Sequence, residues 1–167
     1  MSLVTERIVD KTVYNQNPNE NFKLYQSFLP QIISDFKTNI ENVDFLEPVA
    51  FCDIIRERAE KSAEKFGTPD AKVYEDYKEL LKDETIDVVH VCTPNRAHSF
   101  ITVDAIEAGK HVFCEKPVDH SIEKIQAVAD ALAKHPEIKF QVGFNRRFDH
   151  NFAAIRKAYD AGKIGDA

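Results

Sequence analysis

The chain has 167 residues, of which 43% are hydrophobic, so it can build an ordinary globular core as one domain or as part of a larger protein. Its formal net charge is −6 and it contains no long basic run, which argues against nucleic acid as its main partner. A membrane-spanning helix needs about 18 or more consecutive apolar residues, and the sequence contains no such run.

The three cysteines, Cys52, Cys92 and Cys114, lack the spacing of metal ligands, and no metal site is predicted. Each lies in an apolar, strand-like stretch, so we expect small buried hydrophobic side chains. The first residues also lack the charge and apolar core of a signal peptide. Free thiols in odd number fit a reducing, cytoplasmic setting.

Residues 1–47 form an atypical N-terminal segment that we expect to be largely helical. Residues 1–19 are weakly patterned and end in a loop-like composition. From Phe22 to Val43 the apolar residues recur mostly every three or four positions, the period of a one-sided helix that Pro30 would break or restart. This apolar stripe is predicted to pack in a core, or to bind a partner if nothing in the chain covers it.

Residues 48–167 alternate between strand-like and helix-like stretches. The predicted strands are Pro48–Asp53, Lys72–Tyr74, Ile86–Cys92, His111–Cys114 and Ile138–Phe144. The predicted helices are Arg56–Phe66 closed by Gly67, a short helix from an Asp76 cap to Lys82, Ala97–Ala108, Ser121–Lys134 and Asp149–Ala161. This alternation predicts an α/β fold, doubly wound and mainly parallel, with right-handed crossovers.

Polar residues stand at the carboxyl ends of these strands. One strand ends in Asp53, a later strand is followed by Thr93-Pro94-Asn95, and the next runs into Glu115-Lys116-Pro117. Because ligands of open α/β sheets bind beside the carboxyl edge, these residues are candidates for one site. Lys116 could hold a hydroxyl or a developing alkoxide there, although a solvated surface turn would also explain the motif.

The position of Asp53 also suggests a cofactor preference. An acid at the end of the second strand of a dinucleotide-binding fold can accept both hydroxyls of the adenosine ribose. A carboxylate there repels a 2′-phosphate, so NAD is predicted over NADP. Arg146 and Arg147, after the last strand, could bind phosphate or carboxylate, or pair with the protein's own surface.

Three separated motifs in this order resemble the glucose-fructose oxidoreductase / inositol dehydrogenase / MocA family of NAD(P)-dependent oxidoreductases. They are Thr93-Pro94-Asn95 with His98, then Ala108 to Val112 leading to Glu115-Lys116-Pro117, and Gln141 to Asp149, the last being closest to the inositol 2-dehydrogenase branch. The resemblance spans about residues 49–166. It implies a Rossmann domain for the cofactor and a second α/β domain for most of the substrate, a polyol or sugar.

The resemblance also implies roles for individual residues. Lys116 would match the family's catalytic lysine, and Asp53 would match the acid that binds the adenosine ribose. The nicotinamide ribose would lie near Glu115. The residues expected to border the cofactor are Thr93, Pro94, Asn95 and His98.

The chain departs from the family pattern at both ends. No glycine precedes Gly67, so the Gly-x-Gly-x-x-Gly loop that receives the pyrophosphate is missing. The family's substrate domain, with its general base, would follow Asp166. We therefore expect an incomplete Rossmann-like domain without its usual first strand. Residues Leu3 to Val9, from the same chain or a swapped one, could fill the gap.

Three hypotheses follow for function. The chain could belong to an NAD-dependent polyol or sugar dehydrogenase and be inactive alone, it could be a non-catalytic binding module derived from that family, or it could be a truncated product. The apolar stripe and the open sheet also predict a homo-oligomer or a partner chain. Binding of NAD and turnover of inositol would separate the three hypotheses.

Overall fold

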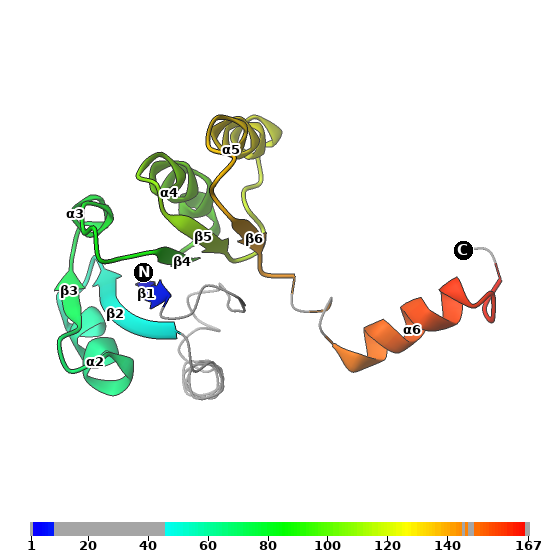
Figure 1. Ribbon diagram of the computed structural model, residues 1–167, viewed down its shortest axis with the longest axis horizontal. Helices are drawn as coiled ribbons and strands as arrows, with labels where there is room; N and C mark the ends of the chain where they lie inside the picture. The colour runs from blue at the N-terminus through cyan, green and yellow to red at the C-terminus, as the bar shows by residue number, and fades with distance from the viewer. Residues whose placement is uncertain (1, 9–45, 145, 147–148, 166–167) are drawn as a thin grey trace.

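The computed structural model describes residues 2–8, 46–144, 146 and 149–165, and Figure 1 shows their arrangement. The strands are β1 (Ser2–Ile8), β2 (Leu46–Asp53), β3 (Lys72–Tyr74), β4 (Val88–Cys92), β5 (His111–Cys114) and β6 (Phe140–Val142). The helices are α2 (Arg56–Phe66), α3 (Tyr77–Leu81), α4 (Asn95–Glu107), α5 (Ile122–Lys134) and α6 (His150–Asp160). From residue 46 onward, every predicted strand and helix is present, with ends displaced by a few residues. The helix predicted between Phe22 and Val43 lies outside the described residues.

Side-chain caps explain where the helices begin. Asp76 accepts a hydrogen bond from the Lys78 N–H at the start of α3, and Ser121 accepts one from the Lys124 N–H at the start of α5. Asp149 does the same for two N–H groups in the first turn of α6. These bonds satisfy donors that have no partner within the helix, so the local sequence sets these three boundaries.

The six strands form one sheet in the order β3-β2-β1-β4-β5-β6. The pairs β2–β3, β4–β5 and β5–β6 are parallel, as predicted. β1 lies between β2 and β4 and is antiparallel to both, with Val4 opposite Phe51 on one side and His90 on the other. The strand order is therefore that of a doubly wound dinucleotide fold, but the central strand is reversed.

The sequence predicted a gap between β2 and β4, and the reversed strand β1 fills it. Residues 2–8 of the same chain occupy the position, so the backbone groups of β2 and β4 find partners there. The pairing with β2 shifts register between Thr5 and Glu6. Because β1 is antiparallel, its carboxyl end lies at the opposite edge of the sheet from the carboxyl ends of β2 and β4.

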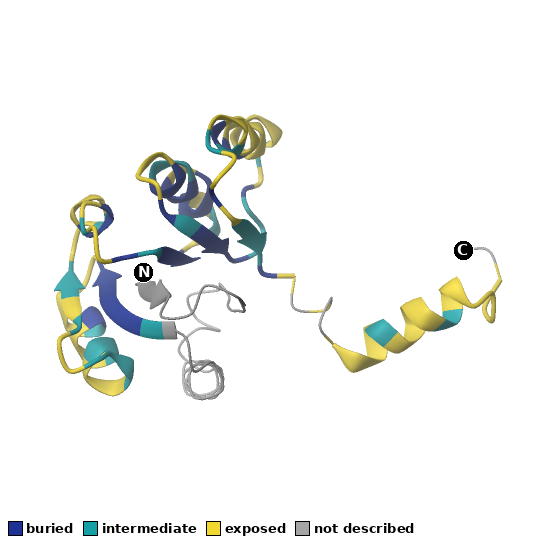
Figure 2. Ribbon diagram, viewed as in Figure 1, coloured by how far each residue is buried: buried dark blue, intermediate teal, exposed yellow. Residues whose placement is uncertain are grey.

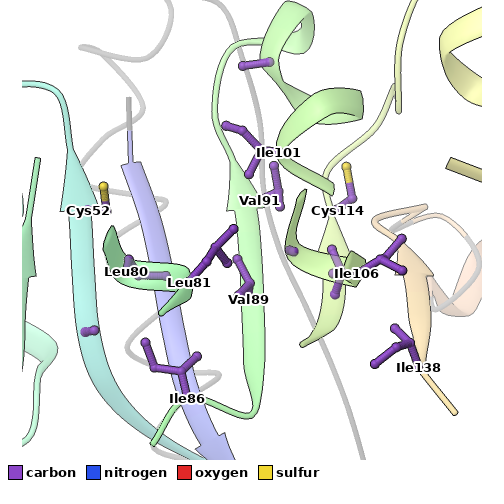
Figure 3. Packing of buried hydrophobic residues seen from close by; sticks show 14 of the residues in the cluster. Cys52, Leu80, Leu81, Ile86, Val89, Val91, Ile101, Ile106, Cys114 and Ile138 are labelled. Atoms are coloured by element: carbon purple, nitrogen blue, oxygen red, sulfur yellow. The ribbon is translucent and has the colours of Figure 1, made fainter. Parts of the chain in front are cut away.

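The main core lies between one face of the sheet and the layer formed by α3, α4 and α5. Alternate residues of β4 and β5 belong to this core, as the two-residue period of a strand requires. Figure 3 shows side chains of the cluster from strands and helices packed together. The labelled members are Cys52, Leu80, Leu81, Ile86, Val89, Val91, Ile101, Ile106, Cys114 and Ile138.

The other face carries the alternate residues and α2. Phe51, His90 and Phe113 are each at most 2% exposed, and the His90 and Phe113 rings lie 5.3 Å apart. His90 is thus a core histidine, as expected. α2 packs close to this face, because a Cβ atom on Gly67 would lie 3.1 Å from the Phe51 ring.

The helix α6 extends away from the sheet (Figure 1) and has no buried residue. Figure 2 shows it almost wholly exposed, in contrast to the buried strands. Within the described residues, no helix is long and apolar enough to cross a membrane.

Candidate functional site

The candidate site lies at the carboxyl edge of β2, β4 and β5. These three strands run in the same direction, so their ends meet at one edge, as the sequence predicted. Asp53 ends β2, Thr93 follows β4 and Glu115 follows β5. β2 and β4, whose carboxyl ends border the ligand in a dinucleotide fold, therefore lie on either side of the reversed β1. The candidate site thus has residues on both sides of that strand.

Asp53 is the acid at the end of the second strand. Its side chain is only 1% exposed, and its Oδ1 atom accepts the Ile55 N–H at 2.9 Å. The next two residues, Ile54 and Ile55, are exposed. The backbone thus holds the carboxylate in place at the edge, at the position that the sequence predicts for the acid that binds the adenosine ribose.

The segment Thr93-Pro94-Asn95 leads directly from β4 into α4. Pro94 is the N-cap, and its carbonyl accepts the Ala97 N–H at 2.6 Å. The Thr93 hydroxyl is fully buried and has no hydrogen-bond partner among the residues that the structure describes. A buried hydroxyl without a partner costs free energy, so Thr93 is an unsatisfied polar residue at the position that the sequence predicts for the cofactor.

Glu115 and Lys116 follow β5. The Glu115 N–H donates to the Val91 carbonyl at 3.0 Å, which extends the ladder between β4 and β5 by one bond. The Glu115 side chain is 1% exposed, and its Oε2 atom accepts the Lys116 N–H at 3.2 Å. The Lys116 side chain is partly exposed, which is compatible with the contact to a bound molecule that the sequence predicts for it.

The loop that carries Lys116 is fixed to the start of α4. The Ser99 hydroxyl donates to Asp119 Oδ2 at 2.6 Å, and Asp119 Oδ1 accepts the N–H groups of His120 and Ser121. The Ser99 hydrogen bond is the largest cause that lowers the pKa of Asp119 from 3.8 to about 2. The Asn95 amide nitrogen also lies 3.3 Å from His120 Nε2.

Ser99 and Asp119 were not among the residues predicted for the site. Asp119 stands two residues before the Ser121 cap, so from the sequence it reads as part of an ordinary turn before a helix. Its pairing with α4 spans 20 residues, and no local pattern reveals such a contact.

His98 lies behind the edge and is 0% exposed. Its Nε2 atom is 2.6 Å from the Thr93 carbonyl oxygen, and its Nδ1 atom is 2.7 Å from the Pro117 carbonyl oxygen. The structure thus brings His98 together with the candidate site residues, and places both ring nitrogens on the protein backbone.

The basic residues after β6 are less closely tied to the site. Arg146 is exposed, and its guanidinium group lies over the Phe152 ring at 5.1 Å. This contact is with an aromatic ring, so phosphate or carboxylate binding and pairing with the acidic surface both stay predictions for Arg146. Arg147 lies outside the described residues.

The edge carries the polar residues that the sequence predicts for the ribose parts of NAD, but β1 provides no pyrophosphate turn there. Asp53, the buried Thr93 hydroxyl and the pair Glu115 and Lys116 supply polar groups at both ends of the edge. In a dinucleotide fold the pyrophosphate sits at the carboxyl end of the first strand, on a glycine-rich turn. Here β1 is reversed and no glycine precedes Gly67, so β1 cannot lead into that turn at this edge.

The sheet order and the polar carboxyl edge together define an α/β domain of the nucleotide-binding Rossmann class. The profile of an oxidoreductase family with an NAD-binding Rossmann fold matches residues 31–144. The chain belongs to this family, the glucose-fructose oxidoreductase / inositol dehydrogenase / MocA group that its motifs resemble. The match begins earlier than the motifs suggested, within residues that the structure does not describe.

Similar proteins include inositol dehydrogenases from several bacteria. The inositol 2-dehydrogenase of Salmonella typhimurium is 37% identical over 133 residues, which are 79% of this chain and 39% of that protein. The myo-inositol 2-dehydrogenase of Thermotoga maritima is 35% identical over 127 residues, which are 76% of this chain and 37% of that protein. The chain therefore spans about two-fifths of the length of these relatives.

Solved structures show the same similarity. The myo-inositol 2-dehydrogenase of Lactobacillus plantarum matches with a TM-score of 0.67 and 32% identity, over 72% of this chain and 35% of that one. The scyllo-inositol dehydrogenase of Lactobacillus casei, solved with NAD(H) and scyllo-inositol, matches with a TM-score of 0.65 and 34% identity. That match covers 70% of this chain and 34% of the other.

Proposed function

We propose that this chain is the cofactor domain of an NAD-dependent oxidoreductase acting on inositol or a related polyol or sugar. The reaction would be hydride transfer from a secondary alcohol. One observation carries the proposal: Asp53, Thr93 and the pair Glu115 and Lys116 stand at one edge of the sheet, on the strands that a dinucleotide fold uses. The inositol dehydrogenases among its relatives support the substrate class.

Each residue of the edge has a distinct proposed role. Asp53 accepts the hydroxyls of the adenosine ribose and disfavours NADP. The cofactor is bordered by the Thr93-Pro94-Asn95 segment, and Glu115 lies near the nicotinamide ribose. Lys116 holds the reacting hydroxyl and offsets negative charge that develops on its oxygen.

The nicotinamide, when bound, supplies the hydride acceptor. The side chains described here can position a hydroxyl and a ribose, but none of them cradles the pyrophosphate. We therefore propose that the chain alone binds NAD weakly or not at all.

Calorimetric titration of the purified chain with NADH tests the proposed site. We expect weak binding that falls further in a double variant, Asp53→Ala with Thr93→Val, because both changes remove polar atoms from the edge. An Asp130→Ala change on the exposed surface of α5 is the matched control and should leave the titration unchanged. Low-micromolar binding by the unchanged chain would contradict the proposed weakness, and measurable binding that is equal in all three proteins would contradict the site.

A second candidate function is a non-catalytic binding or interaction module derived from the same family. The reversed β1 favours it, because within the described residues this strand does not lead into a pyrophosphate turn at the carboxyl edge. Such a module would show no nucleotide binding in the titration above. It would retain the sheet as a scaffold and have no use for the ammonium group of Lys116.

We also propose that the chain works in a reducing, cytoplasmic setting as a homo-oligomer or with a partner chain. Three free cysteines, two of them buried, support the reducing setting. A gap between β2 and β4 was one reason to expect a swapped strand from a second chain, but β1 of the same chain fills that gap. The apolar stripe of residues 22–43 is therefore the remaining support for association. Light scattering at high concentration should show species larger than the monomer, and a monomer at every concentration would contradict this proposal.

A further inference from the structure

We infer that His98 is a positively charged positioning residue that joins the Thr93 segment to the loop carrying Lys116. The inference goes beyond the proposed function, because it assigns His98 a role that needs no contact with cofactor or substrate. Each nitrogen atom of the His98 ring makes a short contact with a backbone carbonyl oxygen. Nε2 lies 2.6 Å from the Thr93 carbonyl oxygen, and Nδ1 lies 2.7 Å from the Pro117 carbonyl oxygen.

Both partners of the ring can only accept hydrogen bonds. A neutral histidine carries one N–H and one bare nitrogen, so it could donate to only one of the two carbonyl groups. The other contact would then place two lone pairs against each other at hydrogen-bond distance. With both nitrogens protonated the ring donates to both oxygens, so the observed geometry is that of an imidazolium.

Two effects oppose a charge at this position. The side chain is 0% exposed, so a charged ring loses its hydration. His98 is also the fourth residue of α4, where the helix dipole disfavours a cation. The two short contacts to carbonyl oxygens replace the lost water, and a fully buried ring has no solvent to satisfy a bare nitrogen.

The charged groups near His98 do not by themselves determine whether its ring is protonated. The loop carries two carboxylates of low exposure, Glu115 and Asp119, and the Lys124 ammonium group on α5 lies 3.5 Å from Asp119 Oδ2. The other titratable groups of the segments around His98 are Arg96, Asp104 and Glu107 on α4, His90 and Cys92 on β4, and Lys116 and His120 on the loop. The charge of the His98 ring is therefore inferred from its direct contacts with the Thr93 and Pro117 carbonyl oxygens.

The position of His98 gives the charge a function. Thr93 precedes the N-cap of α4 and belongs to the candidate cofactor edge, while Pro117 directly follows Lys116. One rigid ring fixes the distance between these two backbone segments. His98 thus acts on the site through Lys116, together with the Ser99 and Asp119 contact between α4 and the same loop.

The protonation of the ring can be measured on the full chain labelled with nitrogen-15. Long-range proton–nitrogen correlation spectra distinguish protonated from bare ring nitrogens. We expect His98 to show two protonated nitrogens at neutral pH. His111 provides an internal control, because its Nδ1 atom accepts the Lys139 N–H and must therefore be bare. One bare nitrogen on His98 would overturn the inference.

The His98→Gln variant identifies the His98 signals and tests positioning. A glutamine amide cannot span both carbonyl groups, so the Lys116 loop should loosen. We expect the Lys116 amide hydrogen to exchange about tenfold faster, the equivalent of one lost hydrogen bond. Exchange of the Val112 amide, which donates to Lys139 within the sheet, should not change. A His135→Gln variant at the far end of α5 is the matched control.

Equal exchange of the Lys116 amide in the His98→Gln variant and the unchanged chain would contradict the positioning role. Should that variant not fold, single Gln substitutions at the other five histidines assign the His98 signals by elimination. The ring measurement on the unchanged chain then decides the inference. Neither measurement uses NAD or activity, so a failure of the proposed enzymatic function would leave this result intact.

Discussion

At the scale of single residues, the candidate site depends on carboxylates that the backbone holds in place. Asp53 is the clearest case, because its Oδ1 atom accepts the Ile55 N–H while the side chain remains at the strand end. A substitution that keeps this bond but removes the charge therefore isolates the electrostatic role of Asp53 from its structural role.

The Asp53→Asn variant tests the preference for NADH over NADPH. The asparagine oxygen can still accept the Ile55 N–H, but it no longer repels a 2′-phosphate. We expect the ratio of the two affinities to move toward NADPH by about tenfold, or about 1.4 kcal/mol. Competition titrations with both nucleotides measure this ratio of affinities, and the Asp130→Asn variant is the control. An unchanged ratio would remove Asp53 from the cofactor site.

Asp119 gives a pH-dependent prediction. Its folded-state pKa is lowered to about 2, first by the Ser99 hydroxyl. A lowered pKa means that the carboxylate stabilises the fold above its ordinary value of 3.8, and that this contribution is lost as the pH falls toward 2. We expect the Asp119→Asn variant to be less stable by about 2 kcal/mol at neutral pH.

The difference in stability between the unchanged chain and the Asp119→Asn variant should shrink steadily as the pH falls from about 4 to about 2. Urea unfolding at several pH values measures it. The exposed pair of Gln126 and Asp130 provides the control, since an Asp130→Asn change should alter stability by less than about 0.5 kcal/mol throughout. A constant difference for Asp119 would show that its charge is not what stabilises the loop.

At the scale of elements, the end of α2 shows how packing can require a glycine without any unusual backbone. Gly67 was predicted to close the helix, and it does, but its φ is −74°. The need is for space, because a Cβ atom would lie 2.6 Å from both the Ala63 carbonyl oxygen and the Ala71 Cβ. Gly162 is the opposite case, with φ +66° and nothing within 4 Å.

These two glycines predict different penalties for the same substitution. Gly67→Ala should destabilise the fold by about 2 kcal/mol, because backbone atoms must move to admit the methyl group. Gly162→Ala should cost only about 1 kcal/mol through its backbone conformation. Thermal and urea unfolding of both variants would compare them. A Gly67→Ala protein as stable as the unchanged chain would mean that α2 does not pack as closely as described.

The strand β1 carries a second prediction for an element. Proline has no N–H to donate, so Val4→Pro should break the pairing of β1 with its neighbours and expose the inner edges of β2 and β4. We expect larger species in light scattering than for a Val4→Ala variant, which keeps the N–H. Identical size distributions for the two variants would argue that the central position of the sheet does not depend on β1.

At the scale of the whole molecule, the proposed reaction needs more than this sheet provides. Hydride transfer requires the nicotinamide, the substrate carbon and a base in one geometry, and positioning of this kind supplies roughly 7–11 kcal/mol of the barrier. A single donor such as Lys116 supplies about 3–4 kcal/mol at best. We therefore expect no measurable inositol dehydrogenase activity from the chain alone.

NADH production with myo-inositol, compared between the chain and a Lys116→Ala variant, measures this expectation. Both proteins should give only the background rate. Turnover by the unchanged chain that disappears in the Lys116→Ala variant would show that the site is complete enough to work. In that case the missing pyrophosphate turn would have a substitute that the described residues do not reveal.

The sequence by itself determined most of the elements from residue 46 onward and the edge at which the site lies. Strand periods, caps such as Asp76 and Ser121, and the order of motifs are local signals, so they can be read without the fold. The parallel direction of β2, β4 and β5 followed from the alternation of strands and helices, and it brought Asp53, Thr93 and Glu115 to one edge.

Only the tertiary structure decided the direction of β1 and the surroundings of His98. A strand shows the same two-residue alternation whether it pairs parallel or antiparallel, so its partners and its direction depend on competition between distant segments. Likewise, the charge of the His98 ring depends on two carbonyl oxygens contributed by separate loops. The Pro117 oxygen lies 19 residues from His98 along the chain, so no local pattern predicts that it lies beside the ring. Folding alone brings the two loops together.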